Sequence, residues 1–335
     1  MTIYDISQKA GVSIATVSRV MNGSTNVRPE TKQRVLDVIK EYGYSPNAFA
    51  RGLGLNTMQA VGIICADCSD MFLAKAIYYV EQELRNAGYE GILCCSGYDL
   101  EGKKEALQVL LQKHVDSVIL IGSHFLYEDD ESNEYIKTAA KTIPIMLLNA
   151  DFDCPNVYCA FCDDFKATYE STSYLIENGS KRILHLYDST SYSGRRKLAG
   201  YQSSMLAHDL PLEKEMCAYF KGDRESATEI ASFLDEVWES GVHFDAISCS
   251  NDYMAMGAVR FARARQLNVP DEFQIMGYNN TVLTTCSYPE LSSVDNKIEM
   301  ISGQIVQTLV EILNGKQMPQ KTIVSPEIIC RETTK

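Results

Sequence analysis

The chain begins with two short segments in which apolar residues recur at helical spacing. The first opens with Thr2 and Asp5 at the spacing of a capping box and ends at Gly11, which can supply a tight turn. The second follows Ser13, whose hydroxyl is suited to cap the first turn of a helix. Its apolar face consists of Val17, Val20 and Met21. A helix, a glycine turn and a serine-capped helix predict a helix-turn-helix.

A third amphipathic segment is expected to start at Pro29, because proline suits the first position of a helix, and to stop at Gly43. Its apolar stripe is predicted to consist of Val35, Leu36, Ile39 and Tyr42. The stretch 44–55 that follows is too short to form a stable helix in water by itself. We interpret it as a linker that becomes ordered when a partner binds to it.

From Val61 onward the pattern changes, and apolar runs alternate with helical segments. Uninterrupted apolar runs between helices are typical of parallel strands in α/β units. Because the alternation forms two blocks, the sequence predicts two doubly wound lobes with a ligand cleft at the carboxyl ends of their strands. The predicted strands are 61–66, 91–96, 115–122, 144–150, 182–188, 217–222, 244–250 and 273–278. The predicted helices are 72–87, 101–113, 132–140, 164–178, 194–208, 225–239, 252–266 and 297–314.

The net charge of −13 is unevenly distributed along the chain. Residues 1–58 carry seven Lys and Arg against four Asp and Glu, which gives +3, and the remainder carries 24 against 40, which gives −16. A basic head on an acidic body suits an anionic partner for the head alone.

The outer face of the second helix carries short side chains apart from one arginine, whose guanidinium is suited to bind the edge of a guanine. That face consists of Ile14, Ala15, Ser18, Arg19 and Asn22. Together with the basic head, it predicts that this helix binds DNA. An ordinary capped surface helix is the alternative interpretation.

No apolar run approaches the roughly 18 residues of a membrane span, and the first residues show no signal-peptide pattern. We therefore expect a cytoplasmic protein without membrane contact, whose eleven cysteines are reduced thiols.

Two Cys-x-x-Cys pairs, Cys65/Cys68 and Cys159/Cys162, are expected to be small buried residues rather than a metal site, because positions i and i+3 point to opposite faces of a strand. No nucleophile elbow or nucleotide-binding glycine loop is present, so neither an enzyme nor a cofactor is expected.

The whole chain resembles the LacI/GalR family of transcriptional repressors, and its head is most similar to the catabolite-control subgroup. The head matches the family at Tyr4-Asp5-Ile6, Ala10-Gly11-Val12-Ser13, Thr16-Val17-Ser18-Arg19-Val20, Asn22 and Tyr44-x-Pro46-Asn47-x-x-Ala50-x-x-Leu53. The body resembles the periplasmic-binding-protein type I fold at Lys197-Leu-Ala-Gly200-Tyr201, Ser250-Asn251-Asp252-x-Met254-Ala255-x-Gly257 and Met276-Gly277-Tyr278-Asn279-Asn280. A periplasmic binding protein would share this body, but it would need a signal peptide and no DNA-binding head.

The resemblance implies a homodimer on a palindromic operator, with the second helix in the major groove and a hinge helix in the minor groove, where Leu53 wedges between base steps. It implies a head over residues 1–45, a hinge over 46–58 and a body over 59–335. The N-terminal lobe would cover about 59–161 and 291–321, and the C-terminal lobe about 162–290 and 322–335. The residues expected to contact DNA are Thr2, Tyr4, Ser13, Ile14, Ala15, Thr16, Ser18, Arg19, Asn22, Asn47, Ala50 and Leu53.

In the cleft the sequence departs from the family's sugar-binding pattern. Lys197 stands where arginine is usual, Asn279 where an acidic residue is common, and Arg224 where lactose-type members carry an aromatic residue. With Arg195 and Arg196, Arg224 would bring positive charge, so the resemblance implies a sugar or a sugar phosphate as effector. A corepressor protein is the alternative partner. The residues expected to bind the effector are Phe72, Asn149, Asp163, Arg196, Lys197, Arg224, Asn251 and Asn279.

Overall fold

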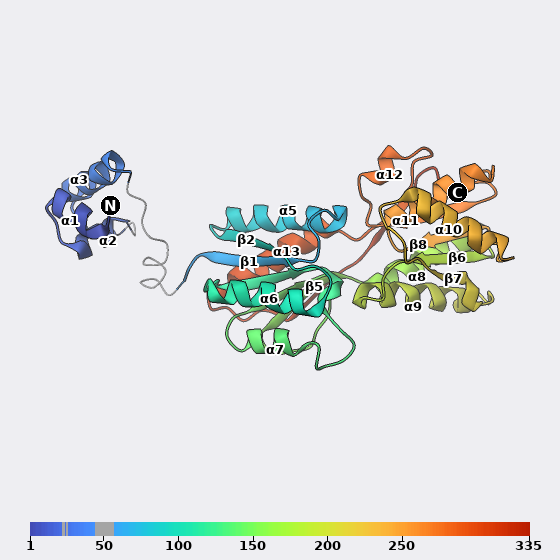
Figure 1. Cartoon of the computed structure of the whole chain (residues 1–335), viewed down its shortest axis with the longest axis horizontal. Helices are drawn as coiled ribbons and strands as arrows, with labels where there is room; N and C mark the ends of the chain where they lie inside the picture. Colours follow the sequence, from blue (N-terminus) through green and yellow to red (C-terminus); the bar gives the residue numbers. More distant parts are fainter. Residues whose placement is uncertain (22–23, 25, 44–56) are drawn as a thin grey trace. The chain divides into compact units, whose positions relative to one another are not determined.

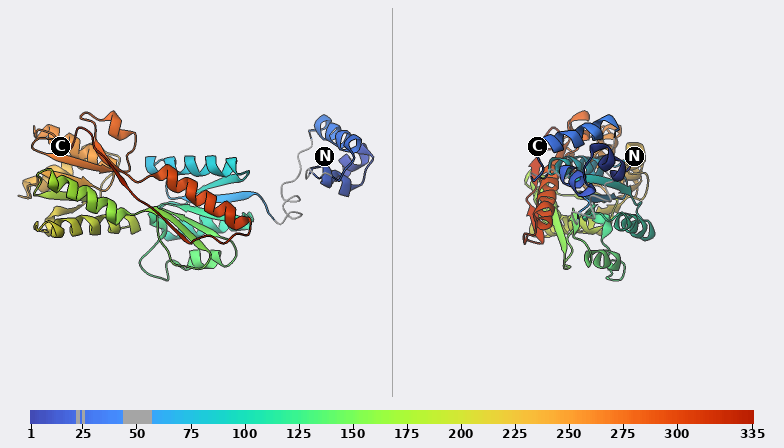
Figure 2. Two further views of the ribbon diagram at one scale, coloured as in Figure 1. Left: turned by 180° about the vertical axis from the view of Figure 1, so that it is seen from behind. Right: turned by 90° about the vertical axis from the view of Figure 1, so that its left-hand side faces the viewer.

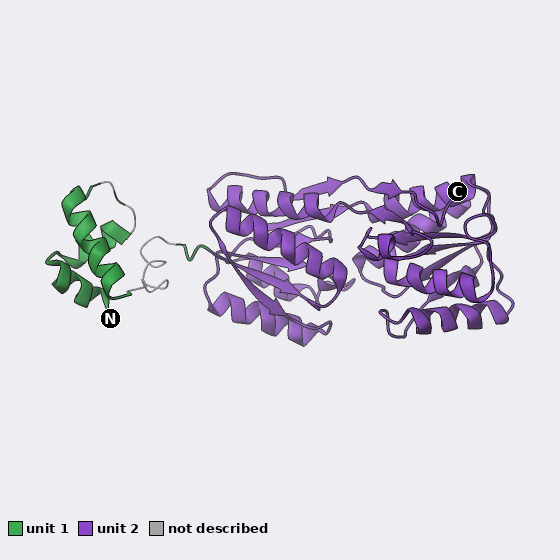
Figure 3. Ribbon diagram, turned by 90° about the horizontal axis from the view of Figure 1, so that it is seen from above, with its two compact units in different colours: residues 1–59 green, residues 60–335 purple. Residues whose placement is uncertain are grey.

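The computed structural model describes residues 1–21, 24, 26–43 and 57–335 (Figure 1). The chain divides into two compact units, residues 1–59 and residues 60–335 (Figure 3). Most of the predicted hinge, including Asn47, Ala50 and Leu53, lies outside the described residues, and so does Asn22 of the predicted recognition helix. The minor-groove wedge at Leu53 therefore stays a prediction from the sequence.

The described part of the N-terminal unit contains three helices, α1 (Ile3–Ala10), α2 (Ile14–Met21) and α3 (Pro29–Glu41) (Figure 1). Thr2 caps α1 in the predicted reciprocal manner. The Asp5 N–H donates to the Thr2 hydroxyl at 3.4 Å, and the Thr2 N–H donates to the Asp5 carboxylate at 2.7 Å. Gly11 follows α1 with a φ of 63°, a left-handed conformation that glycine adopts without strain.

The core of this unit is a small apolar cluster between the three helices. Its buried residues are Ile6, Ala10, Val17, Val20 and Val35. The predicted stripe of α3 is wrong at Leu36, which is 39% exposed, because Leu36 lies about 100° around the helix from Val35. Val38 and Ile39 pack on the cluster instead. Tyr42 is exposed as well, with the ammonium of Lys9 at 4.2 Å from its ring centroid.

The first lobe of the second unit is built on a six-stranded sheet in which all strand pairs are parallel. Its strand order is β11-β5-β4-β3-β1-β2. The bounds are β1 (Ala60–Cys65), β2 (Glu90–Cys95), β3 (Ser117–Ile121), β4 (Ile145–Leu148), β5 (Val157–Cys162) and β11 (Lys321–Val324). Helices α5 (Met71–Asn86) and α13 (Ile298–Leu313) lie side by side on one face (Figure 2). The remaining elements are α6 (Leu100–Gln112), which packs on the other face, η1 (Ser123–Phe125) and α7 (Glu134–Ala140).

The second lobe repeats this plan with the strand order β12-β10-β9-β8-β6-β7. All its strand pairs are parallel except the pair of β10 with β12. The strands are β6 (Ile183–Tyr187), β7 (Cys217–Tyr219), β8 (Ala246–Cys249), β9 (Gln274–Tyr278), β10 (Ser292–Asp295) and β12 (Glu327–Ile329). The helices are α8 (Asp164–Glu177), α9 (Tyr192–Ala207), η2 (Lys214–Met216), α10 (Ala227–Glu239), α11 (Asp252–Ala264) and α12 (Leu283–Cys286).

The chain passes between the two lobes three times, and two of the predicted crossover points are corrected. The first follows β5, which ends at Cys162, close to the predicted position. The second follows Asp295 rather than residue 290, because β10 pairs with β9 in the second sheet. The third follows Val324 rather than residue 321, because β11 pairs with β5 in the first sheet. Both shifted boundaries fall at short strands that the apolar pattern does not mark.

Candidate functional site

The outer face of α2 has the surface that the sequence predicts for DNA recognition. The Thr16 N–H donates to the Ser13 hydroxyl at 3.2 Å, so Ser13 caps the helix. Val17 and Val20 fix the orientation of the helix by their burial, which leaves Ile14, Ala15 and Arg19 exposed. Thr16 and Ser18 are half-buried at the edges of this face. The exposed part of α2 thus combines small side chains with one guanidinium.

Two further predicted DNA contacts lie on or beside α1. The Thr2 side chain is held in the capping box with Asp5, which leaves its hydroxyl engaged within the unit. Tyr4 is exposed, with its ring outside the apolar cluster. An exposed aromatic residue with a hydroxyl is suited to contact a sugar-phosphate backbone.

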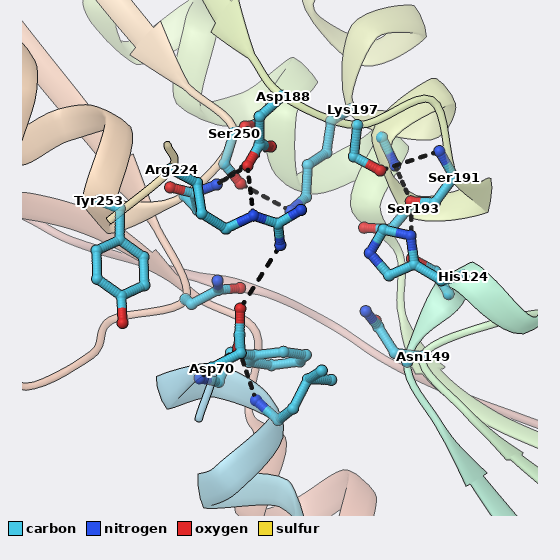
Figure 4. A pocket seen from close by; sticks show the side chains of 18 of the residues that line it. Asp70, His124, Asn149, Asp188, Ser191, Ser193, Lys197, Arg224, Ser250 and Tyr253 are labelled. Atoms are coloured by element: carbon cyan, nitrogen blue, oxygen red, sulfur yellow. Dashed lines mark hydrogen bonds and ion pairs between the residues drawn. The ribbon is translucent and has the colours of Figure 1, made fainter. Parts of the chain in front are cut away.

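A pocket lies between the two lobes of the second unit, at the carboxyl ends of the parallel strands (Figure 4). Six of the eight predicted effector residues line it, and these are Phe72, Asn149, Lys197, Arg224, Asn251 and Asn279. The other lining residues used below are Asp70, Tyr98, Ser123, His124, Asp188, Ser191, Ser250, Asp252, Tyr253 and Thr281. The strand ends therefore bring together the side chains that the doubly wound pattern predicts.

Helix caps hold the polar walls of this pocket in place. Asp70 precedes α5, and its carboxylate accepts the N–H groups of Phe72 and Leu73 at 2.9 and 3.0 Å. Asn251 precedes α11, and its carbonyl accepts the N–H of Met254 at 2.9 Å. The amide nitrogen of Asn251 donates to the Asp188 carboxylate at 3.2 Å, so its side chain is oriented at both ends.

Arg224 joins the two lobes through carboxylates on both sides. Its guanidinium lies 3.7 Å from the carboxylate of Asp188 in the second lobe and 3.8 Å from that of Asp70 in the first (Figure 4). It also donates to the hydroxyl of Tyr98 at 3.5 Å. Burial disfavours its charge, but the carboxylates of Asp188 and Asp70 outweigh burial and raise the pKa of Arg224. The positive charge of this residue is therefore already balanced within the pocket.

The ammonium of Lys197 is held in the wall of the pocket by neutral partners. Its ammonium donates to the carbonyl of Ser250 at 2.9 Å and lies 3.6 Å from the ring centroid of Tyr278. Burial lowers the pKa of Lys197, although the neighbouring Asp164 and Asp188 oppose that shift. His124 is also desolvated, and burial lowers its pKa to about 4, so it is neutral at pH 7.

Asp163, Arg196 and Arg195 do not line the pocket. Arg196 forms an ion pair with Asp163 at 3.4 Å on the surface of the second lobe, and neither residue lines the pocket. Asp163 is the cap of α8 and accepts the N–H of Lys166. Arg195 pairs with Glu128 of the first lobe at 3.0 Å, also outside the pocket. Adjacent positions on α9 point in different directions, so of Arg195, Arg196 and Lys197 only Lys197 faces the pocket.

Sequence reasoning missed several lining residues that carry the same signal as the ones it selected. Asp188 and Asn149 lie at the carboxyl ends of predicted strands, and Tyr98 comes two residues after one, so Asp188 and Tyr98 could have been selected by the same rule. Asp70 has the pattern of a helix cap before α5. Tyr253, in the first turn of α11, and Thr281, in the loop after β9, carry no comparable signal in the sequence.

The cysteine pairs behave differently from each other. Cys159, Cys162 and Cys65 are buried as predicted, but Cys68 is exposed because it lies in the turn after β1 rather than within the strand. Among the described residues, no group of three or more His, Cys, Asp or Glu side chains is arranged to hold a metal ion. In the same part of the chain, no helix has the length and apolar character needed to cross a membrane.

Comparisons with known proteins match both units of the chain. Residues 2–47 match the family described as bacterial regulatory proteins, lacI family. Residues 58–331 match the family described as periplasmic binding proteins and sugar binding domain of LacI family. An HTH-type transcriptional regulator of Lachnoclostridium phytofermentans is 48% identical, with 100% of this chain and 99% of that protein covered. Catabolite control protein A of Staphylococcus epidermidis is 31% identical, with 98% and 97% covered.

Solved structures show the same fold. The chain resembles the lac repressor dimer bound to operator and the anti-inducer ONPF with a TM-score of 0.88 at 23% identity, with 100% of this chain and 99% of that chain covered. It resembles the transcriptional regulator CelR-cellobiose complex with a TM-score of 0.71 at 24% identity, with 99% of each chain covered.

Proposed function

This chain belongs to the LacI family of bacterial regulatory proteins, and from that premise we propose that it is a repressor whose operator binding is controlled by a small effector in the interlobe pocket. Members of the family are DNA-binding transcriptional regulators and not enzymes. The observation that carries the proposal is the ion pair of Arg224 and Asp70 inside the pocket, because it connects a ligand site to the arrangement of the lobes. A protein that binds chromosomal DNA in a bacterium would act in the cytoplasm.

For DNA recognition, the proposal assigns base contacts to the exposed face of α2. Arg19 would donate two hydrogen bonds to a guanine, and Ile14 and Ala15 would contact a thymine methyl group. One short helix reads few bases, so specific binding needs two heads on a palindromic operator. Asn22, Asn47, Ala50 and Leu53 belong to the same proposal on sequence grounds alone.

A homodimer is part of this proposal, and an apolar groove on the body supports it. The groove is lined by α5 and by residues 279–282 and 297–300, and its exposed side chains include Tyr78, Val282 and Met300. Exposed apolar surface of this kind commonly marks an interaction site. We assign a second copy of the chain as its occupant, since the lac repressor structure with the same fold is a dimer. A twofold dimer matches the symmetry of a palindrome.

For the effector, the pocket favours an uncharged polyhydroxylated ligand such as a sugar over a sugar phosphate. The lining contains three aspartates against Lys197 and Arg224, and His124 is neutral at pH 7. Asp252 is occupied by the N–H and hydroxyl of Thr281 at 2.6 and 2.8 Å, but Asp70 and Asp188 could accept hydroxyl groups. A phosphate would have to displace carboxylates from Arg224, and it would meet their charge.

Effector binding would change operator affinity by changing the angle between the two lobes of the body. A ligand that inserts between Arg224 and Asp70 favours one lobe spacing over another, and so changes the separation of the two heads. The effect on operator affinity cannot exceed the ligand's preference for one lobe arrangement.

A thermal-shift screen of neutral sugars and their phosphates against the full-length protein tests the effector assignment, because a ligand that binds only the folded state raises its melting temperature. We expect a neutral sugar to give the largest shift. A phosphate ester that outperforms its parent sugar would favour the anionic alternative. If no sugar or sugar phosphate shifts the melting temperature, a corepressor protein becomes the better assignment.

A further inference from the structure

Three thiols meet at the carboxyl end of β1, outside the residues that line the interlobe pocket. Cys65 is the last residue of β1 and is buried, whereas Cys95 is the last residue of β2 and is exposed. The two are partners in the parallel ladder, so their side chains leave the same face of the sheet. Their sulfur atoms lie 3.8 Å apart.

The third thiol, Cys68, lies in the turn after β1 and is exposed. Its interaction with Cys95 raises the pKa of the Cys68 thiol, first through a hydrogen bond and then through charge. Cys95 is therefore the thiol that both members of the Cys-x-x-Cys pair contact. Since the described residues contain no group arranged as a metal site, oxidation of sulfur is the chemistry that this cluster supports.

We propose that Cys65 and Cys95 form a reversible disulfide when the protein meets a hydroperoxide. Neighbouring strands lie about 4.8 Å apart, which is within the range of roughly 4.4–6.8 Å between the Cα atoms of disulfide-bonded cysteines. Rotation of the two side chains can therefore close the bond without a change in strand pairing. Cys68 is the neighbouring thiol that remains free.

Cys95 reacts first because it is exposed, whereas burial raises the pKa of Cys65 to about 12 and keeps that thiol protonated. The Cys95 sulfur attacks the peroxide oxygen, so that an S–O bond forms, the O–O bond breaks, and an alcohol (water, for hydrogen peroxide) leaves with the thiol proton. The Cys65 sulfur then attacks Cys95, so that the S–S bond forms, the S–O bond breaks, and water leaves with the second proton. The two sulfurs lose two electrons, which reduce the peroxide.

The bond would join the end of β2 to the end of β1, directly before the turn that leads to Asp70. Oxidation would therefore stiffen the segment that carries one partner of the Arg224 ion pair. This consequence rests on the proposed effector site, whereas the disulfide does not depend on it.

The test exposes the full-length protein to hydrogen peroxide and then unfolds it in denaturant, so that N-ethylmaleimide blocks all remaining thiols, the buried ones included. Linked peptides are mapped by mass spectrometry without reduction. We expect two fewer alkylated thiols than the eleven of the reduced protein, a peptide linking Cys65 to Cys95, and full reversal by dithiothreitol. Cys95→Ala should abolish this loss, while Cys68→Ala and the control Cys286→Ala, which also removes an exposed cysteine, should retain it. Circular dichroism verifies that each variant folds.

Three results would overturn the proposal. The first is a wild-type protein that keeps all its thiols under peroxide. The second is a Cys95→Ala protein that still loses two thiols. The third is a linked peptide that joins Cys68 rather than Cys65 to Cys95, which would assign the bond to the exposed pair.

Discussion

The guanidinium of Arg224 lies 3.8 Å from the carboxylate of Asp70, and the two residues belong to different lobes (Figure 4). Asp70 also caps α5, so its position is fixed by the backbone of the first lobe. Both groups line the pocket. A ligand that binds there must replace or extend this ion pair, and we therefore expect ligand binding and lobe arrangement to be linked.

Arg224→Ala is expected to weaken binding of the sugar found by screening at least tenfold, or about 1.4 kcal/mol. The substitution removes guanidinium donors and leaves the nearly buried Asp188 carboxylate without its ion pair. Isothermal titration calorimetry measures the affinity. Arg196→Ala is the matched control, since its surface pair with Asp163 lies outside the pocket. Unchanged affinity in Arg224→Ala, or an equal loss in both variants, would contradict the site.

Arg19→Ala is expected to weaken operator binding by about 1–3 kcal/mol and to relax the preference at one base pair in each half-site. Selection from random DNA with the wild-type protein identifies the operator sequence. Fluorescence anisotropy then measures the operator affinity of the wild type and of the variant. Binding to unrelated DNA should change much less, because phosphate contacts dominate it. Arg34→Ala, an exposed arginine on α3, is the control that should keep the base preference. A wild-type selection without a palindrome would count against the dimeric recognition proposed for α2.

Tyr78→Arg is expected to shift the protein from dimer to monomer in analytical ultracentrifugation. Tyr78 is 51% exposed on α5 and lines the apolar groove, so a guanidinium there would be buried without a partner in the dimer. Leu206→Arg introduces the same side chain at another exposed apolar residue, on α9 and outside the groove, and should leave the dimer intact. If the two variants sediment alike, this groove is not the dimer surface.

His185 is expected to make the protein less stable as the pH falls below neutrality. Burial lowers the pKa of His185 to about 3, compared with about 6.5 in an unfolded chain. Between these values the unfolded state binds a proton that the folded state does not, so the free energy of unfolding falls with decreasing pH by about 1.4 kcal/mol per pH unit. His185→Phe keeps the stacking on Tyr201 and should reduce this dependence in urea unfolding at pH 6.5 and pH 5. Parallel pH dependences in the two proteins would rule out the buried imidazole as its source.

The sequence predicts the fold where a segment is long and apolar. The run 61–66 covers most of β1 and the run 115–122 contains β3, because strands buried on both faces consist mainly of apolar residues. Strand β10 has the sequence Ser-Ser-Val-Asp and is buried, but no local pattern distinguishes it from a loop. Its place in the second sheet depends on pairing with β9, a long-range contact that local patterns do not encode.

A residue of the candidate site is predictable from the sequence where a single strand or helix determines the direction of its side chain. Asn149 directly follows β4 and Asn251 comes two residues after β8, and the sheet alone brings them to the pocket. Arg196 and Lys197 are adjacent on α9, and only the register of that helix decides which one faces inward. The charge balance of Arg224 is not predictable from local sequence, because Asp70 comes from the other lobe.

The most direct test of the central claim is the coupling between effector and operator. Operator affinity of the full-length wild type is measured by anisotropy with and without saturating sugar, and sugar affinity is measured by calorimetry with and without saturating operator. The account predicts that both affinities change by the same factor, within the usual range of about 5-fold to 150-fold. An operator affinity that does not change when the pocket is saturated would contradict it.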